Sequence, residues 1–263
     1  MLKETKLISR YIHHYFNANN EHGIHSPYLF QLLTNCIYAK DKGPIEANIE
    51  QLRSNLKVNA NTINVKDLGA GSTFDGKAKQ RTISSITKHF SKSPKLCQLL
   101  YRLVKFHQPK LMLELGTSMG FSAMYQASGN PNGHLYTVEG CPETHHQANK
   151  NIESIGISNI TTINDSFDHL IPQFIVEHGS PDWVYIDGNH TYEATIRYFN
   201  LLSDSDKDGQ VLVFDDINWS DNMRRAWKEI CMNKEVTMTI NLFYLGLVFI
   251  NKKFSKQDFK IRF

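Results

Sequence analysis

The sequence predicts an α/β protein in which a doubly wound, mostly parallel sheet is covered by helices on both faces. From Pro94 onward, short apolar segments alternate with segments of helical periodicity, the pattern of a parallel sheet buried on both faces. The last two apolar segments have too few residues between them for a crossover helix, so these strands should pair antiparallel. We expect residues 94–254 to form this domain, after a helical cap or lid over residues 1–93 and before a basic tail over residues 255–263.

Three helices are expected before the alternating region, over residues 7–16, 28–38 and 78–90. The first has apolar side chains at helical spacing, and Ser26-Pro27 is typical of the cap and first position of the second. The polar stretch 55–64 is expected to be a connector. The sequence DLGAGS at 67–72 has no buried strand before it and no strand ending in an acid at the right distance after it. It is therefore expected to be a surface loop, or a lid over the site.

Seven strands and the helices between them are expected in the alternating region. The strands are expected at residues 110–115, 134–139, 160–164, 182–187, 210–216, 235–240 and 244–250. The helices are expected at residues 96–107, 121–127, 142–155, 167–177, 192–202 and 221–232.

The composition argues against several classes of protein. The chain has 263 residues, of which 41% are hydrophobic, and this is enough for a packed core. A formal net charge of +3 is too small to indicate a nucleic-acid or membrane partner. The longest apolar run, at 242–250, is far shorter than the roughly 20 residues of a membrane-spanning helix. The start of the chain lacks a secretory signal, and the four cysteines form no C-x-x-C pair, so we expect a reduced, cytoplasmic protein.

A glycine-containing loop follows the first strand of the alternating region. A dinucleotide fingerprint counted from Gly116 needs glycine at 118 and 121, where this chain has Ser118 and Phe121. The pattern present is E-x-G-x-x-x-G, beginning at Glu114. A carboxylate at this place would repel a pyrophosphate but suits an ammonium group, while the helix start after Gly120 offers amides to a carboxylate. The loop therefore favours a ligand with an amino-acid end.

Two further strand ends favour a nucleoside at the other end of that ligand. Glu139 ends the next strand, 19 residues after Gly120, where an acid can bind both ribose hydroxyls. Asp165, Ser166 and Phe167 follow the third strand, where they can meet an adenine edge. Each signal is weak alone, and their order and spacing together make the prediction.

These motifs resemble the class I S-adenosylmethionine-dependent methyltransferases, in the branch of catechol O-methyltransferase and bacterial small-molecule O-methyltransferases. The resemblance covers about residues 94–250 and is carried by LELGTSMGFSA, YTVEGCP, the Asp165-Ser166 turn, WVYIDGNHTY and LVFDDI. It implies a Rossmann-like sheet of seven strands in the order 3-2-1-4-5-7-6, with the last strand antiparallel.

The resemblance also implies S-adenosylmethionine as the cofactor. The residues implied around its methionine part are Glu114, Gly116, Thr117, Ser118, Gly120 and Ser122. The ribose would be held by Glu139, and the adenine would lie among Gly140, Asp165, Ser166 and Phe167. Asp187 is expected beside the cofactor as well.

Acidic residues end the fourth and fifth strands and should converge beside the methyl group. Asp187, Asp215 and Asp216 would repel one another unless a cation joined them, and ligation by oxygen alone suits Mg²⁺, or else Mn²⁺ or Ca²⁺. His190, three residues after Asp187, is the expected general base, and Asp187 is expected to act with it. The alternative is that Asp187 and Asp216 cap the following helices and His190 bonds a loop backbone.

The acidic motif Asp215-Asp216 and the presence of His190 depart from the catechol enzymes, whose motif is Asp-Asn, and look closer to bacterial sugar O-methyltransferases. The expected reaction is methyl transfer from S-adenosylmethionine to a hydroxyl of a small molecule, assisted by a divalent metal and a base. A metal-independent N-, RNA or protein methyltransferase stays open, as do a non-catalytic binding protein and a homodimer. A nicotinamide oxidoreductase is disfavoured by Ser118, Phe121 and Glu114.

Overall fold

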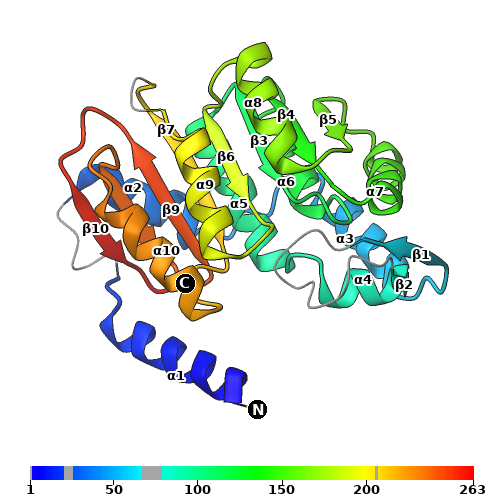
Figure 1. The fold of residues 1–263 in the computed structure, drawn as a ribbon, viewed down its shortest axis with the longest axis horizontal. Helices are drawn as coiled ribbons and strands as arrows, with labels where there is room; N and C mark the ends of the chain where they lie inside the picture. The colour runs from blue at the N-terminus through cyan, green and yellow to red at the C-terminus, as the bar shows by residue number, and fades with distance from the viewer. Residues whose placement is uncertain (1, 21–25, 67–78, 205–206) are drawn as a thin grey trace.

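The computed structural model describes residues 2–20, 26–66, 79–204 and 207–263, and these residues build a central sheet of eight strands (Figure 1). The strands are β3 (Leu111–Leu115), β4 (His134–Val138), β5 (Ile160–Ile163), β6 (Trp183–Ile186), β7 (Gln210–Asp215), β8 (Met238–Asn241), β9 (Leu245–Ile250) and β10 (Gln257–Lys260). Their order is β10-β8-β9-β7-β6-β3-β4-β5. Neighbours from β7 to β5 pair in parallel, and β9 is antiparallel to β7 and β8. Counting from β3 as the first strand, this is the order 3-2-1-4-5-7-6 with β10 added at the edge.

Helices pack on both faces of this sheet, as the apolar strands predict. They are α5 (Pro94–His107), α6 (Phe121–Gly129), α7 (Pro142–Ile155), α8 (Phe167–His178), α9 (Tyr192–Leu202) and α10 (Asp221–Met232). Met112 of β3 packs in one core cluster with α5 and α6, whereas Leu113 and Leu115 pack in another with α8, α9 and α10. This division follows from the pleat, which points successive side chains of a strand to opposite faces.

The region before residue 94 is built from short elements. They are α1 (Leu2–Asn17), α2 (Pro27–Leu32), the π-helix η2 (Leu33–Ile37), α3 (Glu46–Leu56), β1 (Thr62–Val65), β2 (Lys79–Thr82) and α4 (Ile83–His89). The helix expected over 28–38 is α2 continued by η2, and its residues Leu29 and Leu33 belong to the same core cluster as α5. The expectation of a helix over 78–90 is wrong at its start, where β2 pairs antiparallel with β1. The DLGAGS sequence at 67–72 lies outside the described residues.

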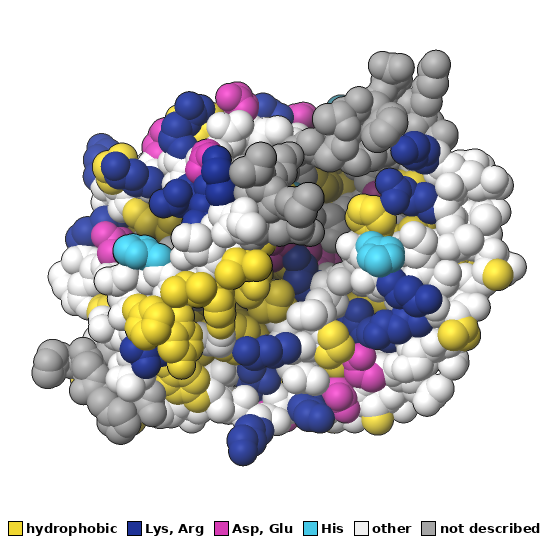
Figure 2. All heavy atoms as spheres, turned by 90° about the horizontal axis from the view of Figure 1, so that it is seen from below, with side chains coloured by type: hydrophobic (Ala, Val, Ile, Leu, Met, Phe, Trp, Pro, Cys, Tyr) yellow, Lys and Arg dark blue, Asp and Glu magenta, His cyan; other side chains and the backbone are white. Residues whose placement is uncertain are grey.

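Helix α1 docks by one side and exposes apolar residues on the other. Tyr11 packs edge-on against Phe243, with ring centroids 5.0 Å apart, and Arg10 donates to the Asn218 carbonyl. Ile8 and Phe16 are 59% and 75% exposed, and hydrophobic side chains gather on the face seen in Figure 2. A homodimer through this face stays a prediction. Within the described parts of the chain, no helix is both long and apolar enough to cross a membrane.

The basic tail expected over residues 255–263 contains an edge strand of the sheet. Residues Gln257–Lys260 form β10, which pairs in parallel with β8, and the side chain of Ile261 is fully buried. The added strand satisfies backbone groups that would otherwise stand unpaired along β8. The four residues of β10 include a single apolar side chain, Phe259, so hydrophobic alternation could not reveal this strand.

Candidate functional site

The carboxyl ends of β3, β4 and β6 meet at one edge of the sheet. The amides of Gly116 and Thr117 donate to the Val138 carbonyl at 3.0 and 3.1 Å, which binds the loop after β3 to the end of β4. The Asp187 amide donates to the Leu115 carbonyl at 2.9 Å, which brings the end of β6 to the other side. Sites of doubly wound sheets lie at this edge.

The loop after β3 turns sharply because three of its residues have positive φ. These are Gly116 (110°), Ser118 (48°) and Gly120 (84°), and Gly120 precedes helix α6. No side chain caps the first turn of α6, so its amides can meet an anionic group such as a carboxylate. This geometry suits the methionine end predicted for the ligand.

Gly116→Ala is expected to destabilise the protein strongly. A Cβ atom at this position would lie 2.2 Å from the Asp187 carbonyl oxygen, at a backbone φ that side chains disfavour. Strain and overpacking together should lower the free energy of unfolding by about 2–6 kcal/mol, measured by urea denaturation. Gly156→Ala is the matched control, since Gly156 also has a positive φ but no atom within 4 Å of the added Cβ. Equal losses in the two variants would contradict the close contact.

Glu139 lies just after β4 and braces the loop that follows β3. Its Oε2 accepts the Ser118 amide and its Oε1 accepts the Cys141 amide, each at 3.0 Å. Each carboxylate oxygen can accept a second hydrogen bond. The sequence predicts that Glu139 also holds the ribose hydroxyls, and Gly140 follows it directly.

Glu114 is enclosed within the protein. Its side chain accepts hydrogen bonds from Gln126 at 2.9 Å and Thr137 at 2.6 Å, and it has no exposed surface. Burial, reinforced by the negative charge of Asp187, raises the pKa of Glu114 to about 7. The carboxylate thus joins α6 to β4, and its predicted contact with the cofactor's ammonium stays a prediction.

Glu114 should make stability depend on pH. Its pKa of about 7 lies above the ordinary value of 4.5, so the folded state binds this proton more tightly than the unfolded state does. The free energy of unfolding should therefore fall between about pH 4.5 and 7, by about 3 kcal/mol from this group. Glu114→Gln replaces the titrating carboxyl group and should therefore remove that fall. The local hydrogen bonds can persist, because the new amide can donate to Thr137, whose hydroxyl can in turn donate to Thr117. Identical pH profiles of the two proteins, by thermal unfolding, would exclude this origin.

The predicted adenine residues follow β5. Asp165 accepts from the Ser166 amide at 2.7 Å and from His169 Nδ1 at 2.6 Å, and this histidine lowers its pKa. Ser166 caps helix α8. Phe167 reaches the end of β6, where a Cβ atom on Gly188 would lie 2.7 Å from the Phe167 ring. These contacts place the β5 end beside the β6 end, and the adenine contact stays a prediction.

A small, partly open cavity lies at this edge of the sheet. It is lined by the predicted residues Gly116, Thr117, Ser118, Ser122 and Asp187, and by Phe90, Ser91 and Lys92 from the segment between α4 and α5. Ser91 Oγ is buried there without a hydrogen-bond partner among the described residues. Polar groups and an unsatisfied oxygen at this place suit the methionine end of the cofactor.

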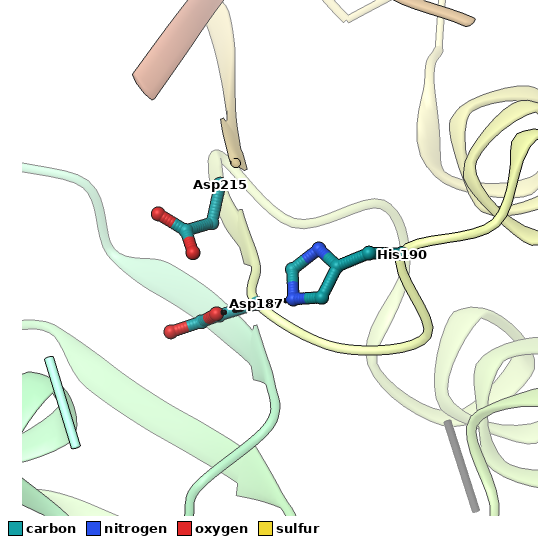
Figure 3. Close-up of side chains that lie close together, drawn as sticks. All are labelled: Asp187, His190 and Asp215. Atoms are coloured by element: carbon teal, nitrogen blue, oxygen red, sulfur yellow. Dashed lines mark ion pairs between the residues drawn. The ribbon is translucent and has the colours of Figure 1, made fainter. Parts of the chain in front are cut away.

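Asp187, His190 and Asp215 form a close group beside the cavity (Figure 3). Within the described part of the chain, one possible ligand atom of each lies within 4.8 Å of the others. His190 Nε2 is 3.7 Å from Asp187 Oδ1. Helix α9 follows Asp187 and helix α10 follows Asp216, and the side chains that cap them are Thr191 and Ser220. Capping of these helices therefore does not explain Asp187 or Asp216.

Asp216, the third carboxylate of the expected cluster, follows Asp215 directly, and its part in the cluster stays a prediction. It follows β7 with a left-handed backbone conformation (φ 53°), so the chain turns away from the direction of the strand at this residue. Burial raises the pKa of Asp216, and the nearby positive charges of Lys92 and His190 oppose that rise. Asp216 thus lies beside the group of Asp187, His190 and Asp215, which holds two carboxylates and an imidazole.

A lysine already joins the two carboxylates. Lys92 Nζ lies 3.3 Å from Asp187 Oδ2 and is also hydrogen-bonded to Asp215 Oδ2. Although burial opposes ionisation, the charges of Lys92 and His190 hold the pKa of Asp187 below its ordinary value. Burial and the negative charge of Asp187 raise the pKa of Asp215 well above its ordinary value.

The ammonium decides whether a divalent metal fits this group. The donor types, two carboxylates and an imidazole, are those of a metal site. A metal bound to both carboxylates would lie next to the Lys92 ammonium, and a divalent ion and an ammonium about 4 Å apart repel by about 8 kcal/mol at an effective dielectric constant near 20. The residues therefore do not fit a divalent metal while Lys92 pairs with both aspartates. Nothing in the sequence distinguishes Lys92 from its neighbours Lys88 and Lys95, so sequence reasoning missed it.

Comparison with known proteins supports the resemblance of the sequence motifs to those of methyltransferases. A family model for the methyltransferase domain matches residues 113–217. A catechol O-methyltransferase from Niastella koreensis is 31% identical over 131 residues, which are 48% of this chain and 58% of that protein. The chain thus spans little more than half the length of this curated relative.

Two solved structures share the fold. An O-methyltransferase from Bacillus cereus in complex with SAH has a TM-score of 0.54 at 18% identity, and the match covers 84% of this chain and 97% of that one. An O-methyltransferase from Streptomyces achromogenes in complex with SAM has a TM-score of 0.53 at 20% identity, with coverages of 61% and 82%.

Proposed function

We propose that this chain, which carries a class I S-adenosylmethionine-dependent methyltransferase domain, transfers the methyl group of S-adenosylmethionine to a hydroxyl of a small molecule. The observation that carries the proposal is the meeting, at one edge of the sheet, of the turn at Gly116, the carboxylate of Glu139 and the group around Asp187. Such an arrangement can hold a nucleoside and an amino acid at once, with a base beside the transferred group.

The residues have separate roles in this proposal. Glu139 holds the ribose hydroxyls, and the amides at the start of α6 hold the methionine carboxylate. When bound, the cofactor supplies a methyl group activated by the positive sulfur. Transfer forms a bond from the acceptor oxygen to the methyl carbon and breaks the sulfur–carbon bond. His190 takes the hydroxyl proton, and Asp187 orients the imidazole and stabilises its charged form.

Mg²⁺ is the second candidate for activating the hydroxyl. It is favoured by the spacing of ligand atoms in Asp187, His190 and Asp215 and opposed by the ammonium of Lys92. The four cysteines are free, which supports the cytoplasmic location expected from the sequence.

Calorimetry and a methylation assay test the proposal. S-adenosylhomocysteine should bind to the protein and NADH should not, and labelled S-adenosylmethionine should methylate members of a panel of phenols and sugars. Binding of NADH in place of S-adenosylhomocysteine would overturn the proposed cofactor. Binding without turnover on any hydroxyl acceptor would favour the non-catalytic protein, and turnover on amines, RNA or protein would favour the other methyltransferase classes.

A further inference from the structure

Lys92 is held in place by its backbone as well as by its side chain. Its carbonyl accepts a hydrogen bond from Arg53 Nη1 at 2.9 Å, and Arg53 is itself 2% exposed and lies over the Phe121 ring at 3.8 Å. Two residues earlier, the Phe90 carbonyl accepts from Ser118 Oγ at 3.3 Å. Helix α3 and the loop after β3 therefore both fix the segment that carries Lys92.

The side chain of Lys92 reaches into the group at the strand ends. It is 15% exposed, and its Nζ contacts Oδ2 of Asp187 and Oδ2 of Asp215, whose side chains are 18% and 1% exposed. Asp187 directly follows β6 and Asp215 ends its parallel neighbour β7, more than ninety residues further along the chain than Lys92. Two such carboxylates side by side need a positive charge between them, and the ammonium supplies it.

We propose that the Lys92 ammonium is the resident cation of this site: it takes the position between Asp187 and Asp215 that a divalent metal would need, and methyl transfer proceeds without such a metal. The reaction is the methyl transfer proposed above. The expectation about turnover rests on that proposed function, whereas the expectation about Mn²⁺ binding does not. Lys92 is a positioning residue, because it holds Asp187 at His190 while the hydroxyl proton passes to the imidazole. Atoms and charge balance without a metal, since the sulfonium loses its methyl group and His190 gains a proton.

Binding of Mn²⁺, measured by electron paramagnetic resonance, tests whether the Lys92 ammonium or a divalent metal occupies the position between Asp187 and Asp215. The native protein should show no Mn²⁺ site that depends on Asp187. Lys92→Met keeps the length of the side chain and removes its charge, so it should gain a Mn²⁺ site that depends on Asp187, at least about tenfold tighter than any binding of Mn²⁺ by the native protein. Lys95→Met, three residues away on the exposed side of α5, should behave as the native protein does. A Mn²⁺ site in the native protein that Asp187→Asn abolishes would overturn the proposal.

Two further measurements keep the test decisive if Lys92→Met folds poorly. Lys92→Arg keeps the charge and should gain no Mn²⁺ site, and a gain in this variant would count against the proposal. The native protein in EDTA should bind S-adenosylhomocysteine and turn over as it does in Mg²⁺, whereas turnover lost in EDTA and restored by Mg²⁺ would overturn the proposal. If no hydroxyl acceptor is methylated under either condition, the proposed function fails, and the Mn²⁺ titration of the native protein still decides the role of Lys92.

Discussion

Asp187→Asn is expected to lower kcat by about 10²–10⁴, the range in which a positioned acid or base contributes to a reaction. The variant keeps the shape of the side chain but removes the charge that pairs with Lys92 and faces His190 at 3.7 Å. The imidazole then loses both its orientation and the stabilisation of its protonated form. Affinity for S-adenosylhomocysteine should change little, because the contacts proposed for Glu139 and the α6 amides persist.

The two quantities can be measured separately, by a methyl-transfer assay at saturating substrate and by calorimetry. Asp258→Asn is the matched control, since Asp258 is an exposed acid of β10 on the edge strand of the sheet. Unchanged kcat would remove Asp187 from the chemistry. Parallel losses of kcat and of affinity would instead make Asp187 mainly a cofactor contact.

Glu139→Gln is expected to weaken binding of S-adenosylhomocysteine by about 10–10³-fold, since hydrogen bonds to a charged group contribute about 1.5–3 kcal/mol each. The amide can no longer accept at both ends, so it must give up a ribose hydroxyl or turn its NH₂ toward the Ser118 or Cys141 amide. At saturating cofactor, kcat should stay near that of the native protein, because Glu139 is not placed at the transferred methyl group.

Calorimetry measures this loss, and thermal unfolding shows whether the brace at Ser118 has also been weakened. Glu143→Gln is the control, because Glu143 is an exposed acid four residues further on that binds Asn64. If Glu143→Gln weakens binding as much as Glu139→Gln does, the effect is one of general charge, and the predicted ribose contact is not supported.

The sheet could be predicted because its strands are buried on both faces. Strand β6 is an uninterrupted apolar run and β7 has four consecutive apolar residues between Gln210 and Asp215, and burial on two faces requires such sequences. Strands β1 and β10 could not be predicted in the same way. They are short and largely exposed, and their pairing is decided by partners elsewhere in the chain.

The candidate site divides in a similar way. Asp187 and Glu139 could be found because each ends a strand, and the order of parallel strands brings such ends together. Lys92 could not be found, because its contact with Asp215 joins residues 123 positions apart and depends on how the segment after α4 crosses the sheet edge. The enclosure of Glu114 was equally invisible, since it depends on the side chains of Gln126 and Thr137.

The bond between the two ends of the chain has a consequence for biosynthesis. His14 Nε2 is hydrogen-bonded to the Ile261 carbonyl, 247 residues away, and Asn19 forms a bridge to the same residue. During translation His14 of α1 emerges from the ribosome 247 residues before Ile261. The helix must therefore wait, with its apolar side uncovered, until the segment around Ile261 has emerged, and its docking is a late event in folding.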